Sequence, residues 1–247
     1  MGAIALRFNQ IDTALDRTVY NNNEDRGAGL PGYGPVRVEG QGITGITDAD
    51  LAYDYAGYVY NFYFTRHGRD SLDGSGMAIV NTVRYCPPWG QGPCPYDNAF
   101  WNGEQMVYGG GMVADDVVGH EMTHAVTQYE SRLFYAYQSG AINEGLSDIW
   151  GEFIDQTYSN GSNPGLRWLI GEDLPPSIGV IRDMAHPHNY GQPERMGDDF
   201  YYACTDAADI NGDWGGVHTN SGVLNKAAYL ITDGGSFNGQ TIAGIGL

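Results

Sequence analysis

The stretch DDVVGHEMTHAVTQY, residues 115–129, organises the chain. Its apolar residues and its lack of proline predict a helix. Two histidines four residues apart, His120 and His124, project from the same face of a helix, one turn above the other. Their imidazoles can therefore close on one zinc ion, and Glu121 lies between them, where it can take a proton from a metal-bound water. The alternative is a solvated helix that holds two histidines by chance.

A catalytic zinc ion needs three protein ligands and an open position for water. One known arrangement places a glycine three residues, and a histidine six residues, after the second histidine; Thr127 and Glu130 occupy these positions and exclude it. Another arrangement takes a glutamate from a second helix. The run NEGLSD, residues 143–148, supplies Glu144 as that ligand, and Asp148 one turn later can accept the free N–H of a liganding histidine. An ordinary acidic helix face is the alternative for both carboxylates.

The composition indicates an acidic globular protein. The chain has 247 residues, enough for one large or two modest domains, and 42% of them are hydrophobic. The sequence holds 12 Lys and Arg against 30 Asp and Glu, a net charge of −18. Such a charge repels phosphate backbones and anionic lipids, so we expect neither a nucleic acid nor a membrane as partner. Clustered carboxylates are also typical calcium ligands.

The cysteines and the amino terminus bear on the compartment. No apolar run approaches the length of a membrane span, and residues 1–9 lack the features of a signal peptide, which is compatible with a mature secreted protein. Cys86 and Cys94 bracket a short proline-rich loop and predict a local disulfide in an oxidising compartment. A zinc pair is the alternative, although the spacing is not that of a zinc knuckle. Cys204 is either a buried thiol or half of a bridge to something outside this chain.

Periodicity predicts an α+β chain that is β-rich first and helical later. We expect a helix over about 49–67, capped by Thr47 or Asp48, and a last helix over about 220–232 that ends at glycines 234 and 235. The other predicted elements are strands near 3–8, 35–38, 77–85 and 99–109, and helices over 115–129 and 140–157.

Four blocks in order carry a resemblance to a known family: NAFWNG (98–103), HEMTH (120–124), GAINE (140–144) and GGVHTNSG (215–222). Together they resemble the thermolysin-like metallopeptidases over residues 96–247, and residues 49–85 resemble the helix and strand that precede. The resemblance implies a two-lobe fold with a cleft between a β-rich lobe, 1–135, and a helical lobe, 136–247. Family members continue past this point into further helices, so we expect a partial helical lobe with uncovered apolar surface.

The resemblance also implies a role for individual positions. The implied zinc ligands are His120, His124 and Glu144, with Glu121 as general base. The implied oxyanion donors are Tyr135 and His218, and Asp213 holds His218. The residues that resemble substrate-binding positions are Asn98, Ala99, Trp101 and Arg182, and those that resemble partners of the liganding histidines are Asn143 and Asp148.

The resemblance implies a secreted zinc endopeptidase that acts on proteins or peptides. Apolar positions that line the pocket after the scissile bond fall at Val117, Ile170, Leu174 and Ile181, which favours cleavage before bulky hydrophobic residues. Calcium is the second implied ion, and its ligands fall at Asp116, Glu152, Asp155 and Glu172. Residues 167–169 lack the acidic residues of a double site, which favours one calcium ion over two. Acidic side chains that merely face water are the alternative.

Two other interpretations of the whole chain stay open. The first is a catalytically incompetent fragment that keeps zinc but lacks a stable substrate cleft. The second is a zinc hydrolase of another substrate class, such as an amidase, which the substrate-strand block 98–103 disfavours.

Overall fold

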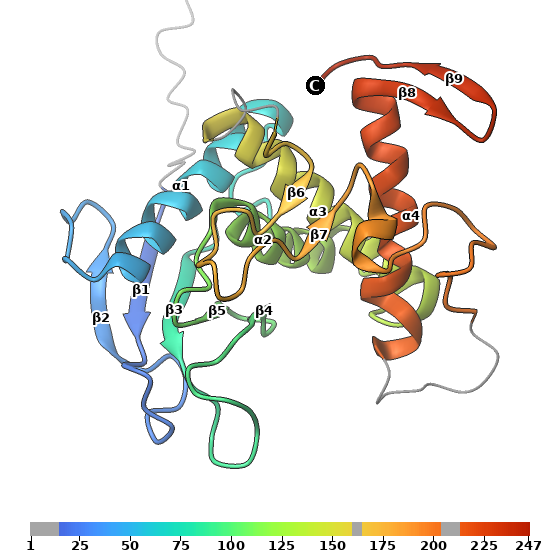
Figure 1. Ribbon diagram of the computed structural model, residues 1–247. Coiled ribbons are helices and arrows are strands. Elements are labelled where there is room, and N and C mark those ends of the chain that lie inside the picture. The colour runs from blue at the N-terminus through green and yellow to red at the C-terminus, as the bar shows by residue number, and fades with distance from the viewer. Residues whose placement is uncertain (1–14, 160–164, 204–212) are drawn as a thin grey trace, which may run out of the picture.

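A computed structural model describes residues 15–159, 165–203 and 213–247 (Figure 1). The predicted strand near 3–8 and Cys204 lie outside the described residues. In chain order the elements are β1 (Arg17–Asn21), β2 (Tyr33–Val38), α1 (Thr47–His67), β3 (Ile79–Tyr85), β4 (Ala99–Trp101), β5 (Met106–Gly109), α2 (Asp115–Glu130), α3 (Tyr137–Tyr158), β6 (Leu169–Ile170), β7 (Arg182–Asp183), the 3-10 turn η1 (Pro187–Tyr190), α4 (Asp213–Asp233), β8 (Gly234–Phe237) and β9 (Gln240–Ala243).

A mixed five-stranded sheet forms one side of the molecule. Its order is β2-β1-β3-β5-β4, with parallel pairing in the centre and antiparallel strands at both edges. Val19, Ile79 and Val83 are fully buried because they face α1 and α2 across the main apolar core. Figure 1 shows the sheet on one side of α2 and α4 on the other, so α2 runs through the middle of the molecule. The fold is α+β, as the sequence predicts.

Helix α1 closely follows its predicted bounds but begins differently. Neither Thr47 nor Asp48 caps it, because helical geometry already starts at Thr47 and no side-chain cap bond forms. Instead the carboxylate of Asp50 accepts the backbone N–H groups of Thr44 (2.9 Å) and Gly45 (2.9 Å), which orders the entry to the helix. The helix ends at Gly68, whose left-handed backbone lets its N–H return to a carbonyl of the last turn.

The predicted strand over 99–109 is wrong in one respect: it is a hairpin of two short strands. β4 and β5 pair antiparallel, with Trp101 opposite Met106. The turn between them forms because the side-chain oxygen of Asn102 accepts the N–H groups of Glu104 (2.9 Å) and Gln105 (2.8 Å). The hairpin places β4 at the edge of the sheet, where α2 packs next to it.

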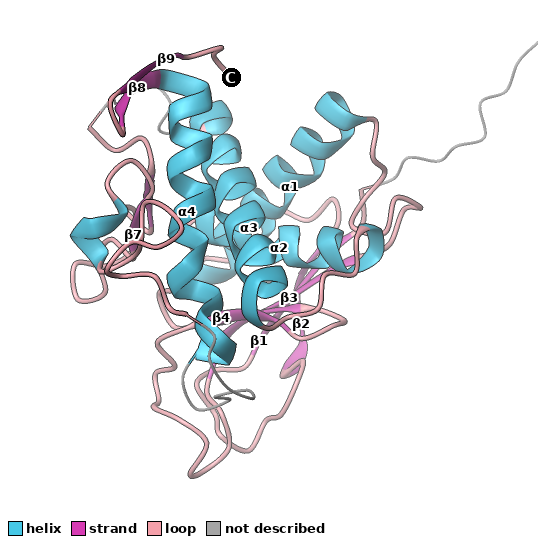
Figure 2. Ribbon diagram, turned by 90° about the vertical axis from the view of Figure 1, so that its right-hand side faces the viewer, coloured by secondary structure: helices cyan, strands magenta, loops and turns pink. Residues whose placement is uncertain are grey.

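The three later helices lie side by side, α3 between α2 and α4 (Figure 2). Helix α4 opens with left-handed backbone at residues 213–216, and its regular part begins at Val217, three residues earlier than predicted. After α4 the chain turns back as the β8–β9 hairpin, which the periodicity did not predict. Within the described residues, no helix combines the length and the apolar character needed to cross a bilayer.

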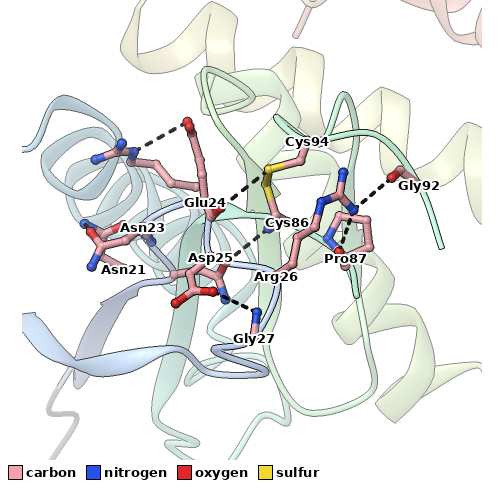
Figure 3. The surroundings of a disulfide bond; sticks show 12 residues. Asn21, Asn23, Glu24, Asp25, Arg26, Gly27, Cys86, Pro87, Gly92 and Cys94 are labelled. Carbon is pink, nitrogen blue, oxygen red and sulfur yellow. Dashed lines mark hydrogen bonds and ion pairs between the residues drawn. A yellow bond between two sulfur atoms is a disulfide. The ribbon is translucent and has the colours of Figure 1, made fainter. Parts of the chain in front are cut away.

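The predicted disulfide between Cys86 and Cys94 is confirmed (Figure 3). The loop that it closes is also held from outside. Arg26 donates from Nη1 to the carbonyl oxygens of Pro87 (2.9 Å) and Gly92 (3.1 Å). The disulfide closes the loop at the end of β3, and Arg26 fastens that loop to the segment that follows β1.

Candidate metal centre and active site

Three side chains from two helices converge on one point. The Nε2 atoms of His120 and His124 on α2 lie 3.0 Å apart. In the carboxylate of Glu144 on α3, Oε2 lies 3.4 Å from the first of these nitrogens and Oε1 lies 3.3 Å from the second. Among the described residues, this is the one group of three His, Cys, Asp or Glu whose ligand atoms all lie within 4.8 Å of one another.

These distances fit a tetrahedral metal ion. With metal–ligand bonds of ~2.0–2.1 Å, the edges of a zinc tetrahedron measure about 3.3–3.4 Å. The two ligand separations to Glu144 match this value, and the histidine pair is slightly closer. Oε2 of Glu144 is buried and makes no hydrogen bond with any described residue. A buried carboxylate oxygen that accepts no hydrogen bond is costly, so a cation at this point would stabilise it.

A close helix crossing brings the third donor into reach. Gly119 on α2 faces Gly151 on α3, and a Cβ atom built on Gly119 would lie only 2.9 Å from the Cα atom of Gly151. Two backbones can approach this closely only where neither carries a side chain. Glu144 lies two turns before Gly151 on α3, so the crossing sets how far its carboxylate reaches toward the histidines.

A second layer of polar groups orients the two imidazoles. Nδ1 of His120 lies 2.9 Å from Oδ1 of Asp148, and Nδ1 of His124 lies 2.8 Å from Oδ1 of Asn143. With Nδ1–H donating to these oxygens, each ring presents the lone pair of Nε2 to the metal position. Arg182 on β7 donates from Nε to Asp148 (3.0 Å).

Sequence analysis missed Asn225, which belongs to the same layer. Its amide nitrogen on α4 donates to Oδ2 of Asp148 (2.8 Å), and the residue is fully buried. The only available signal was its position seven residues after His218, which places both on one face of a helix. Ser147 was also missed; its hydroxyl lies 3.1 Å from Nδ1 of His124.

The charges of the three side chains stabilise one another. Burial opposes ionisation of Glu144, but the two facing histidines more than offset it and hold the pKa of that carboxyl well below its usual range. Burial also disfavours the imidazolium of His120, yet the nearby carboxylates of Asp148 and Glu144 raise its pKa to about 10. Bringing in a dication would therefore displace a proton from this histidine.

Glu121 is buried beside the metal ligands and held by the edge strand. Its Oε2 accepts the backbone N–H of Trp101 on β4 (3.0 Å). The indole of Trp101 in turn donates from Nε1 to the side chain of Gln128, further along α2 (2.8 Å). Trp101 thus hydrogen-bonds to the metal-binding helix through both its backbone and its side chain, which holds β4 against α2. Sequence analysis named Trp101 but not Gln128, whose position on the helix face carries no motif.

Tyr135 and His218 face the metal position from outside α2. The hydroxyl of Tyr135 donates to Glu144 and lies 3.1 Å from Nε2 of His218. Nδ1 of His218 lies 2.5 Å from Oδ1 of Asp213, which also accepts the backbone N–H of His218 (3.1 Å). Burial disfavours the charged ring, but the bond to Asp213 and the charge of Glu144 raise the pKa of His218. The left-handed start of α4 places Asp213 beside this ring.

A cleft of about 1110 Å³ opens over these groups. Its lining includes Asn98, Ala99 and Trp101 along β4, and Arg182 on the opposite side. The apolar end of the cleft is lined by Val117, Ile170 and Ile181, together with Met112. The prediction for Leu174 is wrong: this side chain is buried in the main core and is not part of the lining.

The four predicted calcium ligands lie close to the metal-binding helix. Asp116, Glu152 and Asp155 are fully buried, and Glu172 is half-buried. Asp116 accepts the N–H of Gly171, and Glu152 accepts the N–H of Trp168 (2.5 Å), while Oε2 of Glu152 makes no hydrogen bond with any described residue. Burial raises the pKa of Asp116 to about 7 and of Glu152 to about 8. The acids thus link α2, α3 and the loop that contains β6.

Comparisons with known proteins agree with this arrangement. Residues 40–128 match the family model of the thermolysin metallopeptidase catalytic domain, and residues 131–247 match that of the thermolysin metallopeptidase alpha-helical domain. The chain is 45% identical over 228 residues to a zinc metalloproteinase of Renibacterium salmoninarum, covering 86% of this chain and 41% of that protein. It is 48% identical over 206 residues to a thermolysin of Alicyclobacillus acidocaldarius, covering 79% of this chain and 34% of that protein.

A solved structure shows the same architecture. The precursor of protealysin, a metalloproteinase from Serratia proteamaculans, superposes with a TM-score of 0.74 at 35% sequence identity, covering 90% of this chain and 71% of that one. This chain therefore belongs to the thermolysin metallopeptidase family. It spans less than half the length of the two curated relatives named above.

Proposed function

We propose that this chain is the catalytic part of a secreted zinc endopeptidase. The observation that carries the proposal is the convergence of the two α2 histidines and Glu144, which can occupy three corners of a zinc tetrahedron, with Glu121 lining the cleft beside them. Family membership supports zinc as the ion, and the disulfide supports an oxidising compartment outside the cytosol. The strongly negative charge opposes binding to nucleic acids or anionic membranes. The cleft lies between a β-rich lobe, 1–135, and a helical lobe, 136–247.

His120, His124 and Glu144 would hold the zinc ion. When bound, the ion lowers the pKa of a coordinated water to ~7 and polarises the carbonyl of the scissile peptide. Asp148 and Asn143 hold the two imidazoles in the tautomer that binds a metal.

The remaining chemistry belongs to the side chains of the cleft. Glu121 takes a proton from the attacking water and passes it to the leaving amine. The N–H of Trp101 keeps one oxygen of that carboxylate in place, which leaves the other free to move the proton. Tyr135 and His218 donate hydrogen bonds to the oxyanion that develops on the carbonyl, so their contribution appears as negative charge grows. Asp213 raises the pKa of His218, which keeps its Nε2 protonated for this purpose.

Binding of the substrate backbone falls to the edge strand. β4 is an edge strand, so an extended peptide can add to it through main-chain hydrogen bonds at Asn98 and Ala99. Arg182, held rigid by Asp148, contacts a substrate carbonyl from the other side. Val117, Ile170 and Ile181 form an apolar pocket for the residue after the scissile bond, which favours large aliphatic or aromatic side chains there.

A calcium ion is proposed at the buried acid cluster. Asp116, Glu152, Asp155 and Glu172 come from two helices and a loop, and hard oxygen ligands are those that calcium prefers. Ionising these groups without a cation is costly, as the raised pKa values of Asp116 and Glu152 indicate. A single ion would stabilise the junction of α2, α3 and the β6 loop.

The test is a casein or quenched-peptide assay with and without a zinc chelator, repeated on Glu121→Gln. Cleavage that the chelator abolishes and that Glu121→Gln lacks, with zinc still bound to the variant, supports an endopeptidase. Zinc binding without any cleavage supports the competing proposal, a metal-binding fragment without a competent cleft. Cleavage confined to small amides would support an amidase instead.

A further inference from the structure

The active-site cleft has two ends on either side of the metal ligands. Val117 and Gln128 both line the cleft from α2 and are eleven residues apart, which corresponds to about 16 Å along a helix. The metal-binding histidines lie between them. The Val117 end is the apolar pocket already described. The lining also contains two side chains to which sequence analysis gave no role, Phe134 and Trp214. Phe134 follows the carboxyl end of α2, the end that carries Gln128, and Trp214 precedes Gly215, which packs on Tyr137 just after Phe134. Both therefore belong to the opposite end of the cleft.

Phe134 and Trp214 come from separate segments and are both exposed. Phe134 lies in the link between α2 and α3 and is 74% exposed; Trp214 lies in the left-handed turn that opens α4 and is 46% exposed. Each is next in sequence to a residue of the proposed machinery, Tyr135 and Asp213. The two rings therefore lie within one cleft, beside the oxyanion donors. Exposed aromatic rings that line a cleft are typical of ligand contact.

Trp214 also carries a backbone conformation that its side chain disfavours. Its φ and ψ are 50° and 33°, and the left-handed region is costly for a bulky residue. Other groups hold this turn in place. The carboxylate of Asp213 accepts backbone N–H groups of the first helical turn. Gly215 lies so close to Tyr137 that a Cβ atom on the glycine would fall 2.3 Å from the tyrosine ring.

No contact among the described residues accounts for a tryptophan at this position. Within the described part of the chain, the indole of Trp214 makes neither a hydrogen bond nor a ring contact. A glycine would adopt the same backbone without strain, as the two following residues do. Backbone strain that no contact among residues 15–159, 165–203 and 213–247 offsets is typical of a functional position.

We propose that Trp214 and Phe134 form a subsite that binds a large apolar or aromatic side chain on the acyl side of the scissile bond. This inference rests on the proposed endopeptidase function, which assigns the Val117 end of the cleft to the residue after the bond. Continuity of the cleft then assigns the other end to residues before the bond. A ring or long aliphatic chain seated there buries apolar surface of both side chains and gains from contact between rings.

Arg132 favours a competing ligand at this end of the cleft, an acidic side chain of the substrate. Arg132 lines the same part of the cleft, is exposed, and forms no ion pair among the described residues. Its charge would favour an acidic side chain of the substrate. The aromatic subsite is favoured because two independent segments contribute rings to it, whereas Arg132 is a single, solvated group whose attraction water and salt screen.

The experiment uses three quenched peptides that differ only at the residue before the scissile bond: Phe, Ala or Glu, each with Leu after it. The value of kcat/KM is measured for the wild type, for Trp214→Gly and for Trp89→Ala. Trp89 is an 84% exposed tryptophan in the disulfide loop, outside the cleft lining, and serves as the matched control. We expect the wild type and the control to prefer Phe over Ala by about tenfold, and Trp214→Gly to reduce this ratio to near one. Its thermal stability should not fall, because glycine adopts the left-handed turn without strain.

Binding measured without turnover separates this inference from the proposed function. The dissociation constants of the same three peptides are measured by calorimetry on Glu121→Gln, with and without Trp214→Gly. A preference for the Phe peptide that depends on Trp214 supports the subsite even if no peptide is cleaved, in which case only the catalytic proposal fails. An unchanged Phe-to-Ala ratio in Trp214→Gly, or tightest binding of the Glu peptide, overturns the inference.

Discussion

Replacing Gly151 by alanine tests whether the crossing of α2 and α3 sets the metal geometry. An alanine in the middle of a helix normally stabilises it by up to ~1 kcal/mol relative to glycine. Here the added Cβ would lie 2.6 Å from the backbone oxygen of Asp116 and 3.3 Å from the backbone nitrogen of His120. Both contacts are to backbone atoms, which no rotamer change can move aside. The helices must therefore separate.

The size of the displacement follows from the same distances. Ordinary van der Waals contact begins near 3.4 Å, so α3 must move by roughly 0.8 Å from α2 to relieve the closer contact. Glu144 moves with α3, while His120 and His124 stay on α2. Metal–ligand distances tolerate only about ±0.2 Å, so the ligand set would no longer fit one ion. We expect a net loss of about 1–3 kcal/mol in unfolding free energy and a 10–100-fold loss of zinc affinity.

The assay is competition for zinc against a chromogenic chelator, together with urea unfolding of the same protein. Gly42→Ala is the control, because a Cβ at that position meets no atom within 4 Å. The control should bind zinc and unfold as the wild type does. If Gly151→Ala bound zinc with wild-type affinity and gained the stability expected from helix propensity, the crossing would not control the site.

Three further predictions concern other parts of the molecule. In calcium-free buffer the free energy of unfolding should fall between pH 5 and pH 8. Burial raises the pKa of Asp116 to about 7 and of Glu152 to about 8, above the values of these groups in the unfolded chain. The folded protein is therefore stabilised by their protonated forms, and this stabilisation is lost as the pH rises through this window. Denaturant unfolding at pH 5 and pH 8, with and without calcium, measures this loss of stability, and equal stability in all four conditions would contradict the prediction. Replacing Cys86 and Cys94 by serine should cost about 2.5 kcal/mol, since the bridge closes a loop with a sequence separation of 8; urea unfolding that matches the wild type would show that the loop is ordered without the bridge. Tyr135→Phe should lower kcat by about 100-fold with unchanged zinc content, and an unchanged kcat would remove this hydroxyl from the proposed mechanism.

Sequence patterns located the site where the geometry is local. A spacing of four residues on one helix fixes the relation of His120 to His124, because the helix pitch allows little variation. The loop between Cys86 and Cys94 is likewise short, so the disulfide between them could be predicted from their spacing. Elements with a clear period, such as α1 and α2, were predicted to within a few residues.

Sequence patterns failed where contacts between separate segments decide the structure. The pattern of 99–109 predicts one strand, but the turn at Asn102 and the antiparallel pairing of β4 with β5 divide it into two. Leu174 resembles a pocket residue in sequence, but its side chain packs in the main core and is absent from the cleft lining. Asn225 carries no motif, yet α4 brings its amide to Asp148.

The sequence by itself determined which atoms could bind a metal, since donor chemistry and helical spacing are properties of the chain alone. Only the tertiary structure decided that these atoms meet. The distance from Glu144 to the histidines depends on a helix crossing at two glycines, and the placement of Asp213 and Trp214 depends on a left-handed turn. Both are set by close packing between segments distant in sequence, which no local pattern encodes.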